Sequence, residues 1–230
     1  MMAEWRTYAV EDFIPFTPEV YFRMIERTNE AQWPLQFFAL AGGATVVVLI
    51  LSGRVRPALA VLSAAWFWSG GAFLIHRYAD LNWAGVYFGW AYFAQGVILL
   101  GLAVAPWTPG GDRMARALDP RWLGLAVATG GVLLWPGITA LAGGGWARAE
   151  VVGLLPDPTA VATLGILLMA LKGWRLWAAS VIPLLWCGVT ALMLRVLEAP
   201  WAALPLASAV LVVAGMVWSA VARAPAAADD

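Results

Sequence analysis

Residues 74–100, LIHRYADLNWAGVYFGWAYFAQGVILL, join the end of one apolar run to the start of another. The chain's only histidine, His76, closes the first run, and Asp80 and Asn82 follow within six residues. The second run carries Gln95 well inside it. Polar groups this close to hydrocarbon must be satisfied by other protein groups or by water. The stretch therefore predicts two helices of a packed membrane bundle.

The composition places the whole chain among membrane proteins. It is 62% hydrophobic and 12% charged, with a mean hydropathy of +0.77, whereas soluble domains carry roughly 25% charged residues. Its 14 cationic and 14 acidic side chains balance, so no basic surface for nucleic acid is indicated. The single cysteine, Cys187, excludes an intrachain disulfide. The first thirty residues lack the apolar region of a cleavable signal peptide.

Seven apolar segments approach or exceed the roughly 20 residues that a helix needs to cross a bilayer. They predict an all-α, polytopic transmembrane helix bundle over residues 33–222. Residues 1–32 are expected to form a tail outside the membrane with a short amphipathic helix, and residues 223–230 a cytoplasmic tail. The segments are residues 33–51, 58–75, 83–105, 122–142, 151–171, 174–194 and 201–222.

The short helix in the tail has a clear start. Thr17 is a favourable N-cap, Pro18 fits the first helical position, and Glu19 follows it. Apolar residues then recur at helical spacing, at Val20, Tyr21, Met24 and Ile25. We expect this helix to lie on the membrane surface or to cap the bundle.

The fifth segment is the weakest of the seven. Residues 159–171 are too few for a full span, and adding residues 151–155 brings Pro156-Asp157-Pro158 into the middle. The helix could begin with an unwound part, or the segment could be re-entrant. The alternative to seven spans is therefore six spans plus a re-entrant segment.

Charge predicts the orientation. With seven spans and the N-terminus outside, the cytoplasmic segments hold eight of the 14 cations, and the short inner loops are rich in arginine. Cations are kept on the cytoplasmic side during insertion, whereas acids count for little. The chain is therefore expected to be N-out and C-in.

On this topology, polar residues gather at the outer ends of the helices and could form one ligand-binding site. His76 could titrate near neutral pH, with Glu150 or Asp157 accepting its proton. The simpler interpretation is that His76 is an interfacial anchor and that the acids solvate loops. The predicted ligand-binding residues are Gln36, His76, Asp80, Asn82, Gln95, Glu150 and Asp157.

Several functional classes lack their required residues. The only lysine, Lys172, is placed in a loop and not in the last helix, where a retinal protein would need one. One histidine does not suffice for a catalytic zinc or a bis-histidine haem, and no H-E-x-x-H or G-x-S-x-G motif is present. No catalytic residue, metal or cofactor is therefore predicted, and an enzyme is the minority interpretation.

Two functional hypotheses remain. The first is a small-solute permease or ligand-binding membrane protein with an outward-facing polar site, whose ligand is a small molecule or a lipid. The alternative is a non-catalytic subunit or assembly factor of a larger membrane complex. The expected partners are the lipid bilayer and either a second membrane protein or further copies of this chain, without nucleic acid.

Three stretches resemble a known family. The opening PFTPEVYFRMIERTNEAQWPLQ, the block around His76, Asn82 and Gln95, and PDPTAVATLGILLMA followed by VIPLLW are similar to the domain of unknown function 6064 family. The resemblance covers nearly the whole chain. It implies an integral membrane architecture and a location in the bacterial inner (cytoplasmic) membrane, and it implies no activity.

Overall fold

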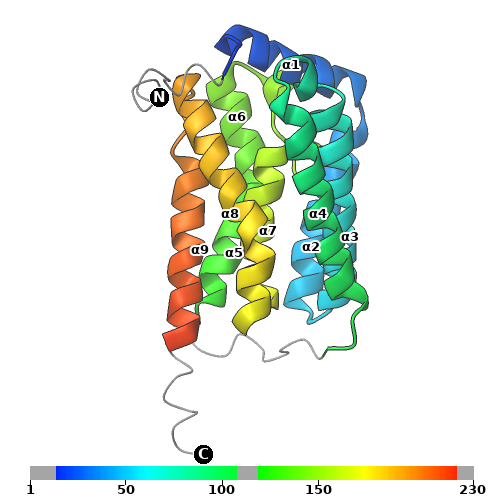
Figure 1. Cartoon of the computed structure of the whole chain (residues 1–230), viewed down its shortest axis with the longest axis vertical. Helices are drawn as coiled ribbons and strands as arrows, with labels where there is room; N and C mark the ends of the chain where they lie inside the picture. Colours follow the sequence, from blue (N-terminus) through cyan, green and yellow to red (C-terminus); the bar gives the residue numbers. More distant parts are fainter. Residues whose placement is uncertain (1–13, 108–118, 222–230) are drawn as a thin grey trace, which may run out of the picture.

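The computed structural model describes residues 14–107 and 119–221, and every regular element in these residues is helical. The long helices stand side by side in one bundle (Figure 1). The predicted all-α fold is thus confirmed. The α-helices are α1 (Pro18–Ala31), α2 (Leu35–Leu51), α3 (Val55–Trp68), α4 (Ala84–Val104), α5 (Arg121–Thr129), α6 (Trp135–Gly143), α7 (Pro156–Ala170), α8 (Gly173–Val196) and α9 (Leu204–Val221).

Five helical stretches in the described residues are long and apolar enough to cross a membrane, as expected of a multi-pass membrane protein. A sixth span is reached only if α1 and α2, which meet at 92°, are counted together. The predicted fifth segment, residues 151–171, corresponds to α7, whose 15 residues extend only about 22 Å at 1.5 Å per residue. The five stretches are Val55–Asp80, Ala84–Val104, Arg121–Gly143, Trp174–Val196 and Leu204–Val221.

The short helix α7 occupies the centre of the bundle. All of its residues are buried, and it packs against α3, α5, α8 and α9. Figure 1 shows it running along the bundle. Because protein surrounds α7, its length does not have to match the thickness of the hydrocarbon layer. This explains why a segment at the core of the fold gives the weakest span signal in the sequence.

Glycines allow α7 and α5 to approach closely. A Cβ atom at Gly165 on α7 would overlap backbone atoms of Gly124 and Ala128 on α5. Next to α5, a Cβ atom at Gly131 would lie 2.7 Å from the backbone nitrogen of Ala162. The crossing therefore depends on the absence of side chains at these positions, as is common where membrane helices pack.

Two of the long helices contain a π-helical turn. The turn η3 (Ser69–Ile75) continues α3, and η5 (Gly130–Leu134) joins α5 to α6. Pro136 lies in the first turn of α6, directly after η5. Proline has no N–H to donate, so the helical hydrogen-bond pattern must change ahead of it, and a wider turn accommodates that change.

The helix α1 lies across one end of the bundle, which we call the α1 end (top of Figure 1). The Phe16 ring, just before α1, lies 5.8 Å from the Tyr78 ring in the short turn η4 (Tyr78–Asp80). The Phe22 ring lies 5.7 Å from the Trp201 ring, in the α8–α9 connection. These aromatic contacts bring α1 onto the connections of later helices, so α1 caps the bundle. The C-terminal end of α9 lies at the opposite end.

Candidate functional site

Residues 149–155, which we call the α7 leader, connect the short turn η6 (Trp146–Arg148) to α7. The N–H of Gly153 donates to the Thr159 hydroxyl at 2.7 Å, and that hydroxyl donates to the Leu155 carbonyl at 2.6 Å. Gly153 has φ +82°, a conformation that glycine adopts without strain. At the other end of the leader, the N–H of Glu150 donates to the Thr139 hydroxyl at 2.9 Å. Both ends of the leader are thus held by hydroxyl groups of neighbouring helices.

Two carboxyl groups are buried, one near the start of the leader and one in the first turn of α7. Glu150 and Asp157 are 1% and 2% exposed. The indole N–H of Trp135 donates to Glu150 Oε2 at 2.9 Å. Asp157 Oδ1 accepts hydrogen bonds from the Trp186 indole at 2.9 Å and from the Thr190 hydroxyl at 2.8 Å. The second oxygens, Glu150 Oε1 and Asp157 Oδ2, are buried and have no hydrogen-bond partner in the described residues.

The environment of this carboxyl pair favours the protonated form of Glu150. Burial raises the pKa of Glu150 well above its ordinary range, and the charge of Asp157 raises it further. The hydrogen bond from Trp135 acts in the opposite direction, and its effect is smaller. None of the hydrogen bonds to the two carboxyls described above comes from a cationic side chain. Glu150 is therefore protonated more readily than an exposed glutamate.

Further polar contacts fix α7 against its neighbours. The Tyr92 hydroxyl on α4 donates to the Pro156 carbonyl at 3.0 Å. The Trp66 indole on α3 donates to the Thr163 hydroxyl at 2.8 Å. Cys187 on α8, the residue after Trp186, is enclosed among these groups at 1% exposure. The polar residues at this end of the bundle are therefore largely used to position α7.

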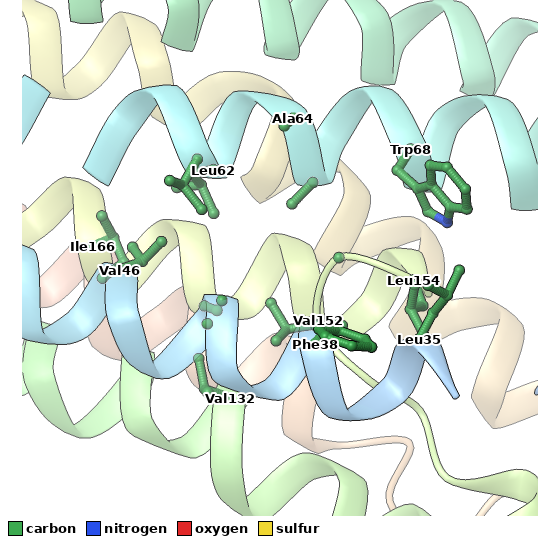
Figure 2. Close-up of a pocket in the computed structure, with 17 residues that line it drawn as sticks. Leu35, Phe38, Val46, Leu62, Ala64, Trp68, Val132, Val152, Leu154 and Ile166 are labelled. Atoms are coloured by element: carbon green, nitrogen blue, oxygen red, sulfur yellow. The ribbon is translucent and has the colours of Figure 1, made fainter. Parts of the chain in front are cut away.

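A cleft of about 320 Å³ lies between α2, α3, α7 and the α7 leader. Figure 2 shows Phe38 and Val46 of α2, Leu62 and Trp68 of α3, and Ile166 of α7 around it. All of the lining side chains are apolar or aromatic. The arrangement offers contact with hydrocarbon and almost no hydrogen bonding.

The cleft extends from the exposed sides of α2 and α3 to the central helix. A Cβ atom at Gly42, on the α2 side, would meet no atom within 4 Å. At the back of the cleft, Ala162 and Ile166 of α7 are each 1% exposed. The helix α2 packs mainly on α3 and more sparsely on α7. A molecule in the cleft would thus separate α2 from the core of the bundle.

The structure places the predicted ligand-binding residues in different surroundings. Glu150 and Asp157 come together in the core, whereas the side chains of His76 and Asp80 are exposed. Within the described part of the chain, no hydrogen bond or ion pair involves the His76 side chain. The suggested proton transfer between His76 and a carboxylate has no contact to support it here.

The three remaining predicted residues form hydrogen bonds with the backbone. Asn82 is buried and accepts a hydrogen bond from the Ala84 N–H at the start of α4, at 2.9 Å. Gln95 is fully buried and donates to the Ala179 carbonyl of α8 at 3.0 Å. Gln36 donates to the Asn29 carbonyl at 2.7 Å and lines a separate cavity of about 740 Å³ at the α1–α2 bend.

Sequence reasoning missed the residues that bind the carboxyl pair and those that form the cleft. Trp135 and Trp186 lie far from each other in the sequence, and each resembles an interfacial anchor. The four-residue spacing of Trp186 and Thr190 places both on one helical face, which is the signal that could have linked them. The adjacent glycines Gly42 and Gly43 were the corresponding signal for the cleft.

No metal site is evident in the part of the chain that the structure describes. Residues 14–107 and 119–221 contain no group of three or more His, Cys, Asp or Glu side chains that could hold a metal ion.

Comparison with known proteins gives one family and no annotated relative. Neither a curated protein nor a solved structure matches the chain. A family described as being of unknown function, DUF6064, matches residues 18–225. This range is most of the chain and includes all of the described helices. The chain therefore belongs to the domain of unknown function 6064 family.

Proposed function

We propose that this membrane protein binds an apolar ligand from the bilayer, the hydrocarbon chain of a lipid, in the cleft between α2, α3 and α7. The observation that carries the proposal is the uniformly apolar lining of a space of about 320 Å³ that reaches the central helix. Ligand sites in proteins typically measure about 300–1,000 Å³. The proposal keeps the ligand binding expected from the sequence but places the ligand in an apolar cleft, apart from the predicted polar residues.

The route into the cleft favours a ligand dissolved in the membrane. Phe38 on α2 is 70% exposed, and Val61 and Trp68 on α3 are 40% and 47% exposed. These side chains both line the cleft and face outward, where apolar surface is expected to meet lipid. A lipid chain could enter between α2 and α3 without leaving hydrocarbon.

The chemistry of the lining argues against a polar solute. Water is held in a protein cavity by polar partners, and cavities lined only by apolar groups stay dry or take up apolar molecules. A small-solute permease would instead need polar groups along a path between the two ends of the bundle. The centre of the described bundle is filled by α7, whose residues are all buried. The alternative hypothesis, a subunit of a larger complex, stays a prediction that co-purification tests.

We further propose seven spans, with the N-terminus outside and the C-terminus in the cytoplasm of a bacterium, in its inner membrane. The central position of α7 supports counting it as a short span shielded from lipid. The arginines of the short loops opposite the α1 end support the orientation. A reporter fused after residue 230 should be active in the cytoplasm. Activity in the periplasm would contradict this topology.

Photolabelling tests the ligand proposal. Protein in nanodiscs would be irradiated with a phospholipid that carries a diazirine in its acyl chain, and the labelled peptides would be mapped by mass spectrometry. Lipid around the outside of the bundle can label only exposed surfaces. A chain in the cleft should also label Ala162 or Ile166, which are each 1% exposed.

Two matched glycine variants provide the control. Gly42→Leu should fill the cleft and abolish labelling of α7, because a side chain at Gly42 extends into open space. Gly188→Leu makes the same change at a helical glycine on α8 that also has open space around it and lies outside this cleft. It should leave the labelling unchanged. Labelling confined to exposed residues in the unaltered protein, or unaffected by Gly42→Leu, would overturn the proposal.

A further inference from the structure

A third cavity, of about 490 Å³, lies at the end of the bundle opposite α1. The last turn of α4 and the first turns of α8 form its walls, with Leu102 and Ala178 among the lining residues. The segment after α4, which includes Trp107, closes one side. The walls are apolar except for one charged side chain, that of Arg175.

Aromatic rings hold this arginine in place. The guanidinium carbon of Arg175 lies 5.5 Å from the centre of the Trp107 ring and 5.2 Å from that of Trp174. The Trp107 indole in turn donates to the Leu102 carbonyl at 2.6 Å, which fixes one of the rings. Cation–π contacts stabilise a guanidinium group but do not neutralise its charge. Within residues 14–107 and 119–221, no acidic side chain forms an ion pair with Arg175.

A second arginine adds to the positive charge at this rim. Arg56, on α3, donates to the carbonyls of Ala105 and Trp107 at 3.0 and 2.9 Å. These bonds fix the backbone beside the cavity. They also bring a second guanidinium group to the segment of Trp107, whose ring Arg175 contacts. The mouth of this otherwise apolar cavity therefore carries positive charge.

We propose that this cavity binds an anionic phospholipid, with its phosphate against Arg175 and one acyl chain along the walls of α4 and α8. The guanidinium group presents N–H donors in a geometry that suits phosphate, and it can do so while stacked on indole rings. Tryptophan and arginine together are typical of the level at which lipid headgroups lie. The apolar walls accept the lipid chain. A free phosphate ion would leave that part of the cavity unfilled. This site is independent of the cleft between α2, α3 and α7.

Native mass spectrometry of the detergent-purified full chain can test the assignment, with dioleoyl phosphatidylglycerol and dioleoyl phosphatidylcholine as probes. The unaltered protein should retain one phosphatidylglycerol in preference to phosphatidylcholine. Arg175→Gln should weaken that preference roughly fivefold, the effect expected of one arginine near a lipid surface. Gly101→Leu keeps the charge but fills the cavity, since a Cβ atom there meets nothing within 4 Å, and it should remove the bound lipid.

Further variants separate lipid binding from misfolding. Arg195→Gln removes an exposed arginine from the other end of α8 and should leave the preference intact. Arg175→Lys keeps the charge without the planar donors and should give an intermediate preference. Melting curves of all variants would show whether each has folded, and Gly42→Leu should leave phosphatidylglycerol binding unchanged.

Three results would overturn the proposal. The first is equal retention of the two lipids by the unaltered protein. The second is an unchanged preference in folded Arg175→Gln. The third is displacement of phosphatidylglycerol by an equal concentration of glycerol phosphate, which would identify a site for soluble phosphate.

Discussion

The helices α7 and α2 have similar lengths, yet they occupy opposite environments. Every one of the 15 residues of α7 is buried, whereas α2 buries only Gly43, Val46, Val47 and Ile50 among its 17. Hydropathy alone does not explain the difference, because the exposed helix, α2, is the more apolar of the two. The difference lies in the few polar and small residues: α7 begins with Asp157 and Thr159, which bind neighbouring elements, and crosses α5 at Gly165. Apolar residues bring a helix into the membrane, and its few polar and small residues decide its position in the bundle.

The sharpest test of this contrast removes the acceptor at the start of α7. Asp157→Leu leaves the Trp186 indole and the Thr190 hydroxyl buried without an acceptor, and each such group costs about 1–3 kcal/mol. We expect a loss of roughly 4 kcal/mol in the free energy of unfolding, measured in detergent by denaturant titration.

Two variants calibrate that result. Asp157→Asn keeps an oxygen acceptor and should cost far less than Asp157→Leu. Gln36→Leu on α2 removes one hydrogen bond to the Asn29 carbonyl and should cost about 1 kcal/mol. Equal losses for Asp157→Leu and Gln36→Leu would show that α7 and α2 are held alike, contrary to the comparison.

A methyl group can probe the two helices at glycine positions. Gly165→Ala places a Cβ atom against the backbone of α5 and should destabilise the protein by about 2–3 kcal/mol. Gly42→Ala, on α2, extends into open space and should be neutral or slightly stabilising, since alanine favours helix. Melting temperatures of the two variants, compared with the unaltered protein, check this. The contrast fails if the two substitutions lower the melting temperature equally.

The carboxyl pair predicts a pH dependence of stability. The pKa of Glu150 is raised in the folded protein, so folding takes up a proton at pH values above the ordinary glutamate pKa of about 4.3. Stability should therefore fall as the pH rises above that ordinary value, with a slope of at most about 1.4 kcal/mol per pH unit for this group. Glu150→Gln still offers an acceptor to Trp135 and should flatten the profile. An unchanged slope in Glu150→Gln would mean that other groups cause it.

The smallest effects are expected where the sequence predicted a site but the structure shows exposed side chains. His76→Ala and Asp80→Ala should each change the free energy of unfolding by less than about 0.5 kcal/mol, because both side chains are exposed. They should also leave lipid labelling of the cleft unchanged. A large loss of stability in either variant would contradict the comparison, because it would show that these exposed side chains hold this end of the bundle together as the buried ones do.

The sequence was sufficient for the helical fold and the approximate helix positions, because long apolar runs have few alternatives. The predicted segment 174–194 and α8 (Gly173–Val196) differ by at most two residues at either end. Helix order could not be converted into spatial order, however. Nothing in the sequence of the fifth segment shows that it lies at the centre of the bundle. Its short apolar run suggests instead a segment at the edge of the membrane.

The candidate site was predictable only in part for a similar reason. Glu150 and Asp157 were selected because the predicted topology gathers them with other polar residues at one end of the helices, and both prove to be buried. Their donors Trp135 and Trp186 could not be assigned, since the sequence does not distinguish a tryptophan that binds a buried carboxyl from one that contacts lipid. The cleft depends on how far α2 stands from α7, a tertiary distance that no local pattern encodes.

The enclosure of Cys187 has a practical consequence for mapping this protein in a cell. Its thiol is 1% exposed, so a bulky maleimide that cannot pass a bilayer should not reach it. A cysteine introduced into a loop can then be labelled with the maleimide from either side of the membrane. The native Cys187 can stay in place because it does not react. The sidedness of every connection becomes measurable in the otherwise unaltered chain.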